Sequence, residues 1–293
     1  MIAPFPKPRP FPREQRRVKR PMTIAAGIAC ADGTLICADS EVSYAPSKRQ
    51  REKVYSFENH LLLTGSGNGD FMKMAFDKLC DEYKSSRPVN PSDARQILET
   101  LVLKIHQEHI FSFYQATDPE RPSLNLIVAS RCKDGRLALV RTRDTAAILV
   151  DRYEATGSGE DLFEYWARLF YRSTLTMDLM SYLTLFILRE VKSNVMGCGG
   201  DSHIVWMPKD ENTKVVGRFF TEDMILAGFP DRVVQILVEC RDLGVDDKRL
   251  ERDLVKFVEA VNAVRQEEKR KFGMGKFIRE KQPDKDTKPT EPE

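Results

Sequence analysis

The sequence contains few of the residues that build disulfide frameworks or zinc sites. Its 293 residues include only six cysteines and four histidines, and the cysteines are widely scattered with no C-x-x-C pair. This spacing argues against a disulfide framework or a structural zinc site and is typical of reduced thiols in an intracellular protein. His106 and His109 are three residues apart, so they do not form the H-E-x-x-H zinc pattern. We expect neither a metal nor another cofactor.

Long hydrophobic runs and a large excess of one charge are also missing. No apolar stretch approaches the ~18 residues that a membrane-spanning helix requires, and the start of the chain lacks the apolar core of a secretory signal. The formal net charge is +2, with both signs spread along the chain, which argues against a dedicated nucleic-acid-binding protein. These absences predict a cytoplasmic globular protein whose partners include neither a membrane nor a nucleic acid.

The chain is expected to hold one folded domain between two polar ends. Residues 1–22 are rich in lysine, arginine and proline. Because proline fixes φ and like charges repel, this leader is predicted to be disordered. Residues 269–293 are similarly charged and interrupted by prolines, and they are predicted to form a disordered tail. The domain predicted between them covers residues 23–268 and ends with an extra C-terminal helix.

Within this domain, hydrophobic patterns typical of strands alternate with patterns typical of helix pairs. Residues 23–30 and 34–40 flank Asp32-Gly33, a common hairpin turn. A strand, a G-S-G triplet and a helix follow one another at 61–84 and again at 153–171. This order predicts an α+β sandwich in which helix pairs cover a central double sheet. Further strands are predicted at 53–57, 60–67, 124–130, 136–142, 146–150, 202–207 and 214–220, and helices at 70–84, about 90–113, 161–171, 177–192, 222–243 and 247–270.

Three stretches carry a more specific signal: TIAAGIACADGTLICADS at 23–40, KVYSFENHLLLTGSG at 53–67 and ATGSGED at 155–161. In this order and spacing they resemble proteasome β subunits and their bacterial relatives, over roughly residues 23–220. The resemblance implies an N-terminal nucleophile (Ntn) hydrolase with a four-layer αββα sandwich. It also implies a threonine endopeptidase that forms a homo-oligomeric ring, cleaves peptides or unfolded proteins, and works with an ATP-dependent unfoldase or an α-type ring.

The resemblance assigns a catalytic role to five residues of this chain. Thr23 matches the N-terminal threonine nucleophile, whose hydroxyl needs a base such as its own α-amino group. Asp39 and Lys53 match the aspartate and the lysine whose positive charge favours an alkoxide-like transition state. Gly67 matches the glycine whose N–H binds the oxyanion. Ser158 matches the serine that lies near the threonine amine.

Several positions depart from the family pattern. Glu41 stands after A-D-S, where an arginine or a similar residue is expected. Cys198 occupies the place of a family serine, and Val195 that of a second aspartate. Asn194, one residue away, is a candidate to supply the hydrogen bond of that aspartate without its charge. Gly65 suggests space for a large apolar substrate side chain.

Two alternative functions follow from these departures. Loss of the second aspartate favours a non-catalytic Ntn-fold scaffold or binding subunit, whereas retention of Thr23, Asp39, Lys53 and Gly67 together argues against it. The third hypothesis is an Ntn amidohydrolase that acts on a small amide, because no motif identifies the substrate.

The mechanism also requires a free α-amine on Thr23, so residues 1–22 must be absent from an active enzyme. One route is self-cleavage of a propeptide, but related proteins usually carry glycine before the threonine, and Met22 stands here. The other route is translation from Met22, followed by removal of methionine before a small residue. We favour the second route, since the composition of the leader differs from that of the domain.

Overall fold

The computed structural model describes residues 23–44, 47–118 and 120–220. Every described residue belongs to the first of the two units of the chain, Met1–Val233. The predicted leader, the charged tail and the two helices expected at 222–243 and 247–270 lie outside the described residues. Among the residues described, no helix has both the length and the hydropathy needed to cross a membrane.

The first sheet has five antiparallel strands in the order β10-β1-β2-β11-β12. The predicted hairpin is present, with Cys30 opposite Gly33 in the register of its two strands. Gly33 begins a strand rather than lying in the turn, and a Cβ there would collide with Met177 and Met207. The strands are β1 (Ile24–Cys30), β2 (Gly33–Asp39), β10 (Tyr153–Gly157), β11 (Ser202–Pro208) and β12 (Val216–Phe220).

The second sheet also has five antiparallel strands, in the order β5-β6-β7-β8-β9. Its strands are β5 (Tyr55–Phe57), β6 (Leu61–Gly67), β7 (Leu124–Arg131), β8 (Leu137–Arg143) and β9 (Ala146–Leu149). A separate two-stranded hairpin, β3 (Glu41–Tyr44) with β4 (Ser47–Gln50), was not predicted, because its residues are mostly polar and lack a clear strand pattern.

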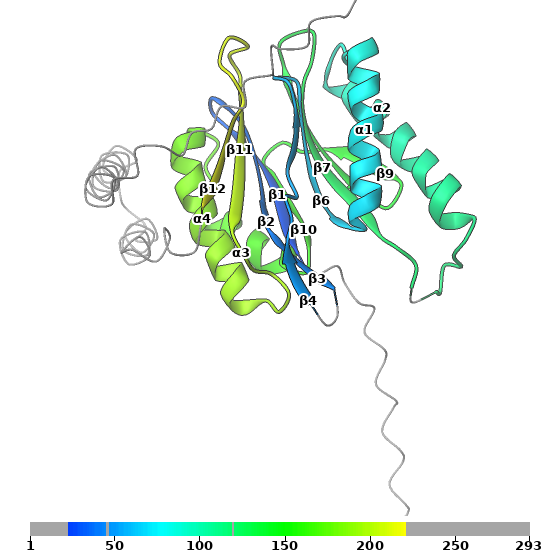
Figure 1. The fold of residues 1–293 in the computed structure, drawn as a ribbon. Coiled ribbons are helices and arrows are strands. Elements are labelled where there is room, and N and C mark those ends of the chain that lie inside the picture. Colours follow the sequence, from blue (N-terminus) through cyan, green and yellow to red (C-terminus); the bar gives the residue numbers. More distant parts are fainter. Residues whose placement is uncertain (1–22, 45–46, 119, 221–293) are drawn as a thin grey trace, which may run out of the picture. The chain divides into compact units, whose positions relative to one another are not determined.

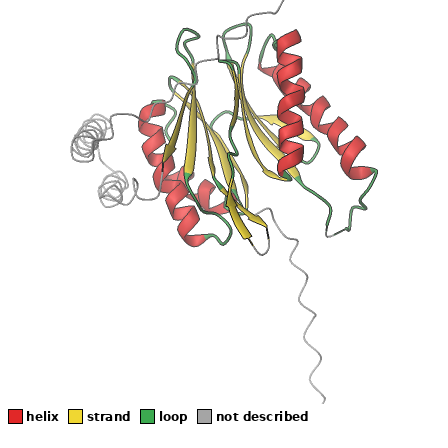
Figure 2. Ribbon diagram, viewed as in Figure 1, coloured by secondary structure: helices red, strands yellow, loops and turns green. Residues whose placement is uncertain are grey.

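Two helix pairs cover the outer faces of the two sheets (Figures 1 and 2). Helices α1 (Gly69–Ser85) and α2 (Pro91–Ile105) pack on the second sheet, and α3 (Glu160–Phe170) and α4 (Met177–Asn194) pack on the first. The inner faces of the sheets contact each other, through β1, β2 and β10 against β6 and β7. The predicted four-layer αββα sandwich is therefore confirmed.

Local signals set the helix starts. Asn68 and Asn90 cap α1 and α2 with their side-chain oxygens, as asparagine often does at helix N-termini. The helix predicted to run to about residue 113 changes character after Ile105. It continues as a π-helix, η1 (His106–Phe111), so the chain is helical as far as Phe111 but the type of helix changes.

Buried apolar residues fill the space between the sheets and fix the strands that carry the site. Leu62 and Ile127 from the second sheet pack there against Ala25 and Ile36 from the first. Because β1 and β2 are buried on both faces, their sequences read as nearly continuous apolar runs. The polar residues at the ends of these strands are therefore held on a rigid frame.

Candidate active site

Thr23 lies directly before β1 and is almost fully buried, with 5% of its surface exposed. Its backbone N–H donates to Ser158 Oγ at 3.2 Å, and Ser158 Oγ–H donates to the Thr23 carbonyl at 3.3 Å. Gly157, at φ +105°, brings the end of β10 so close that a Cβ there would collide with the Thr23 carbonyl. The second G-S-G triplet therefore packs directly against the backbone of Thr23.

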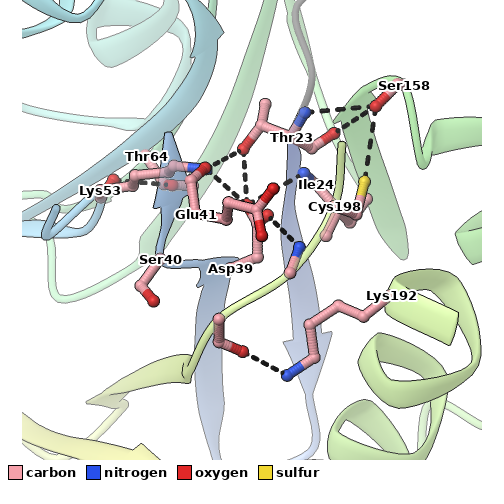
Figure 3. A network of polar contacts seen from close by, with 12 residues as sticks. Thr23, Ile24, Asp39, Ser40, Glu41, Lys53, Thr64, Ser158, Lys192 and Cys198 are labelled. Atoms are coloured by element: carbon pink, nitrogen blue, oxygen red, sulfur yellow. Dashed lines mark hydrogen bonds and ion pairs between the residues drawn. The ribbon is translucent and has the colours of Figure 1, made fainter. Parts of the chain in front are cut away.

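The side chain of Thr23 contacts Asp39 and Lys53, as Figure 3 shows. Thr23 Oγ1–H donates to Asp39 Oδ1 at 2.6 Å, and Lys53 Nζ donates to Thr23 Oγ1 at 2.6 Å. Lys53 Nζ also lies 2.7 Å from Asp39 Oδ1, with the lysine side chain 6% and the aspartate side chain 0% exposed. The hydroxyl oxygen thus accepts a hydrogen bond from a buried ammonium group while its proton points to a carboxylate.

Backbone groups hold Lys53 in this position. Lys53 Nζ donates to the Glu41 carbonyl, and the Thr64 hydroxyl donates to the Lys53 carbonyl at 2.9 Å. Thr64 lies in β6, whereas Asp39 ends β2, so the lysine is fixed between the two sheets. A buried charge of this kind persists only where a partner and hydrogen bonds compensate its lost hydration.

The Asp39 carboxylate accepts two further hydrogen bonds from backbone N–H groups. The Ile24 N–H lies 3.2 Å from Oδ1 and the Gly199 N–H lies 3.0 Å from Oδ2. Gly199 was not predicted as a site residue, because a backbone N–H donor cannot be recognised from the residue type. The only available signal was the G-C-G-G run at 197–200. A Cβ at Gly199 would collide with the Glu41 carboxylate, so Glu41 packs over this loop.

Cys198 joins the network through Ser158. The two side chains approach to 3.4 Å between Sγ and Oγ, and Cys198 is 6% exposed. Burial raises the pKa of the Cys198 thiol to about 11, which keeps it protonated at neutral pH. Asn194 instead donates to the Glu190 carbonyl of its own helix at 2.8 Å on the exposed side. The structure therefore does not bring Asn194 to Thr23.

Gly67 ends β6 with φ +114°, and a Cβ there would collide with the Ser123 carbonyl. The conformation requires glycine, although the network of side-chain contacts around Thr23 does not include this residue. Gly65 has a packing explanation, because a Cβ there would collide with the Asn125 carbonyl of β7. The space that we expected at Gly65 for a substrate side chain is thus filled by a neighbouring strand.

Four of the five predicted site residues therefore meet in one network, formed by Thr23, Asp39, Lys53 and Ser158. No three His, Cys, Asp or Glu side chains within the described ranges are placed to hold a metal ion together. The network instead contains a hydroxyl oxygen, an ammonium group and a carboxylate, a combination suited to activating a nucleophile.

The four-layer sandwich places this protein among the Ntn folds. Residues 21–207 match the family described as "Proteasome subunit", so the chain belongs to the proteasome subunit family. No curated protein matches the sequence.

Solved structures share the fold at low sequence identity. A Gly-1 mutant of Anbu from Hyphomicrobium sp. strain MC1 superposes with a TM-score of 0.61 at 14% identity, covering 76% of this chain and 98% of that chain. The Anbu complex from Pseudomonas aeruginosa, described as a helical assembly, gives a TM-score of 0.61 at 15% identity, covering 75% of this chain and 95% of that chain.

Proposed function

We propose that the chain is a threonine-type endopeptidase subunit with Thr23 as its N-terminal nucleophile. The observation that carries the proposal is the position of Thr23 Oγ1, 2.6 Å from both Lys53 Nζ and Asp39 Oδ1 in a buried site. An isolated threonine hydroxyl is a poor nucleophile. A neighbouring ammonium group lowers the cost of forming an alkoxide-like transition state.

In this mechanism the α-amine of Thr23 is the general base. A free α-amine has a pKa of about 7.7–8.0, so much of it is neutral near working pH. The amine takes the hydroxyl proton, Oγ1 bonds to the carbonyl carbon of the substrate, and the Gly67 N–H stabilises the oxyanion. The C–N bond then breaks, and the leaving amine takes the proton. Water hydrolyses the ester on Thr23 and restores the hydroxyl.

In this proposal Ser158 positions the amine, and the contact with Cys198 Sγ helps to hold the Ser158 side chain in place. The backbone nitrogen of Thr23 already lies 3.2 Å from Ser158 Oγ, and an N-terminal amine would occupy the same place. Because Val195 stands at the position of the second family aspartate, we assign the negative charge of the site to Asp39.

The proposal requires removal of residues 1–22. We propose that translation from Met22 and loss of that methionine expose Thr23, with autoprocessing of a propeptide as the other route. The similarity to the Anbu complex, described as a helical assembly, supports an oligomer as the working form. Peptides or unfolded proteins are the proposed substrates, in the cytoplasm, with an ATP-dependent unfoldase or an α-type ring as a further proposed partner.

A non-catalytic scaffold is the second candidate function. It is favoured by Val195, which removes a charge from the family pattern, and by the 22 residues that precede Thr23 in the sequence. An amide bond on the Thr23 nitrogen would leave no base for the hydroxyl. A small-amide hydrolase would share the mechanism of the peptidase and differ only in substrate.

The first experiment determines the intact mass and the N-terminal sequence of the protein purified from its native host. A chain that begins at Thr23 is expected, and it should react with a peptide epoxyketone, which needs both the hydroxyl and the free amine of a threonine. Thr23→Ala should abolish this adduct and peptide cleavage, while the matched Thr23→Ser variant should retain part of both. A mature protein that still carries residues 1–22 contradicts the proposal and supports the scaffold. Cleavage of small amides but of no peptide in a panel supports the amidohydrolase.

A further inference from the structure

A buried arginine of the second sheet contacts the segment that carries Ser158. Arg141 lies in β8, and only 7% of its side chain is exposed. Its Nη1 forms an ion pair with Glu154 of β10, and its Nη2 lies 2.6 Å from Glu160 Oε1 at the start of α3. One side chain thus reaches across the sandwich to two elements of the opposite half.

Glu154 and Glu160 flank the turn that wraps Thr23. Between them β10 ends at Gly157 and α3 begins at Glu160, with Ser158 in the connection. Glycines at 157 and 159 give this connection little conformational preference of its own. A guanidinium group that binds one carboxylate before the turn and one after it fixes both ends of the segment.

The contact is built to be strong. Arginine offers several donors in a planar fork, so one side chain can bind two carboxylates in a defined geometry. Arg143 also reaches Glu160 at 2.9 Å, but its side chain is 68% exposed and contributes little. Burial, together with the charges of Glu154 and Glu160, raises the pKa of Glu164. Arg141 is thus the buried cation that binds the carboxylates of Glu154 and Glu160.

A second polar contact crosses the same gap between the sheets. Ser66 and Thr156 approach to 2.8 Å between their hydroxyl oxygens, and each is 1% exposed. Ser66 precedes the proposed oxyanion glycine, and Thr156 lies two residues before Ser158. The two T-G-S-G segments of the chain are thus linked directly, in the same region that Arg141 holds from β8.

We propose that Arg141 is a positioning residue of the active site, which acts through Ser158. It holds the end of β10 and the connection to α3, from Ala155 to Gly159, so that Ser158 Oγ stays within hydrogen-bond distance of the Thr23 nitrogen. This inference rests on the proposed function. It adds a residue of the opposite sheet, outside the predicted catalytic set, to the machinery that orients the amine base.

The test compares Arg141→Lys with a matched control, Arg131→Lys, in the oligomeric protein that begins at Thr23. Arg131 is another buried arginine of the same sheet, 0% exposed, and it donates to the carbonyls of Asn59, Pro208 and Lys209. Both variants keep the positive charge but lose the planar, forked guanidinium group. We expect Arg141→Lys to lower kcat for a fluorogenic peptide about tenfold with KM changed less than about twofold, as misplacement of a catalytic group does. Arg131→Lys should leave both constants near wild type.

The pH profile distinguishes positioning from a general loss of stability. Ser158 Oγ accepts the hydrogen bond from the Thr23 nitrogen, so it favours the protonated amine. Loosening Ser158 should move the rising limb of the kcat/KM profile to lower pH in Arg141→Lys, and the profile of Arg131→Lys should not move. Equal loss of activity in both variants, with no shift of the limb, overturns the proposal.

A double-mutant cycle tests whether Arg141 acts through Ser158. In a Ser158→Ala background, Arg141→Lys should lower kcat less than about twofold. The same tenfold loss in both backgrounds overturns the proposal, and so does a Ser158→Ala variant as active as wild type. If Arg141→Lys does not fold, Glu160→Gln replaces it in the double-mutant cycle, because it weakens the same contact. Peptide cleavage that survives Thr23→Ala contradicts the proposed function itself, a result distinct from each of these.

Discussion

The buried pair of Lys53 and Asp39 allows a test of the site that does not depend on substrate. We consider the substitution Lys53→Met, which keeps the length of the side chain and removes its charge. The two side chains are 6% and 0% exposed, with Nζ and Oδ1 2.7 Å apart. At this distance the attraction is roughly 6 kcal/mol for an effective dielectric constant near 20, and much of it offsets the cost of removing both groups from water.

Removing one member of such a pair leaves the other charge buried alone, which typically costs about 3–5 kcal/mol. Asp39 would keep three donors, the Thr23 hydroxyl and the N–H groups of Ile24 and Gly199. We therefore expect a loss near the lower end of that range, about 3 kcal/mol. The double variant Asp39→Asn, Lys53→Met removes both charges and should be more stable than the sum of the single effects predicts, by about 2 kcal/mol.

The assay is equilibrium unfolding in urea at pH 7, followed by far-UV circular dichroism and by tryptophan fluorescence, whose coincidence tests for a two-state transition. With a slope of about 2 kcal/mol per molar urea, Lys53→Met should lower the midpoint by about 1.5 M. Lys73→Met is the control, since Lys73 and Asp77 form an ion pair with exposed fractions of 48% and 57%, and it should cost less than about 0.5 kcal/mol. Equal losses from Lys53→Met and Lys73→Met would refute the reasoning.

Three further predictions concern backbone strain and titration. Gly67→Ala should destabilise the protein by more than about 2 kcal/mol in the same assay, because it adds a collision with Ser123 to an unfavourable φ. Gly135→Ala, at φ +82° with no atom within 4 Å of the added Cβ, should cost only about 1 kcal/mol; equal costs would exclude the collision. Burial lowers the pKa of His203 from 6.5 to about 4, so between these values the unfolded chain binds a proton that the folded chain does not. Stability should therefore fall as the pH drops from 6.5 toward 4, and His203→Gln should reduce that slope in unfolding curves measured across this range. Burial raises the pKa of Cys198 from 9.0 to about 11, so the unfolded thiol loses its proton first and stability should fall above pH 9, less so in Cys198→Ala. Iodoacetamide at pH 8 should modify Cys198 readily only after unfolding, and fast labelling of the folded protein would contradict the burial.

Much of the architecture could be predicted from local patterns. The apolar runs of the strands, the amphipathic helices and the asparagine caps each depend on neighbours within a few residues, so periodicity reports them. The elements that were not predicted lack such a local pattern. The hairpin of β3 and β4 is polar and has no strand pattern, and the change from α-helix to π-helix after Ile105 has no marker in the apolar spacing.

The sequence by itself determined the residue types of the site. Asp39 and Lys53 are close to Thr23 in the chain, and the motifs that contain them resemble those of the family. The tertiary structure decided how residues that are distant in the chain meet at the site. Ser158 lies 135 residues from Thr23, and the Gly199 N–H binds Asp39 across 160 residues. Arg141 reaches its carboxylates from the opposite sheet. Ser158 was predicted from its motif, but its contact with Thr23 and that of Gly199 with Asp39 depend on strand pairing within the first sheet. The Arg141 contacts depend on how the two sheets pack, and the Gly199 N–H is a donor that every residue except proline carries, so no local pattern in the sequence could specify these contacts.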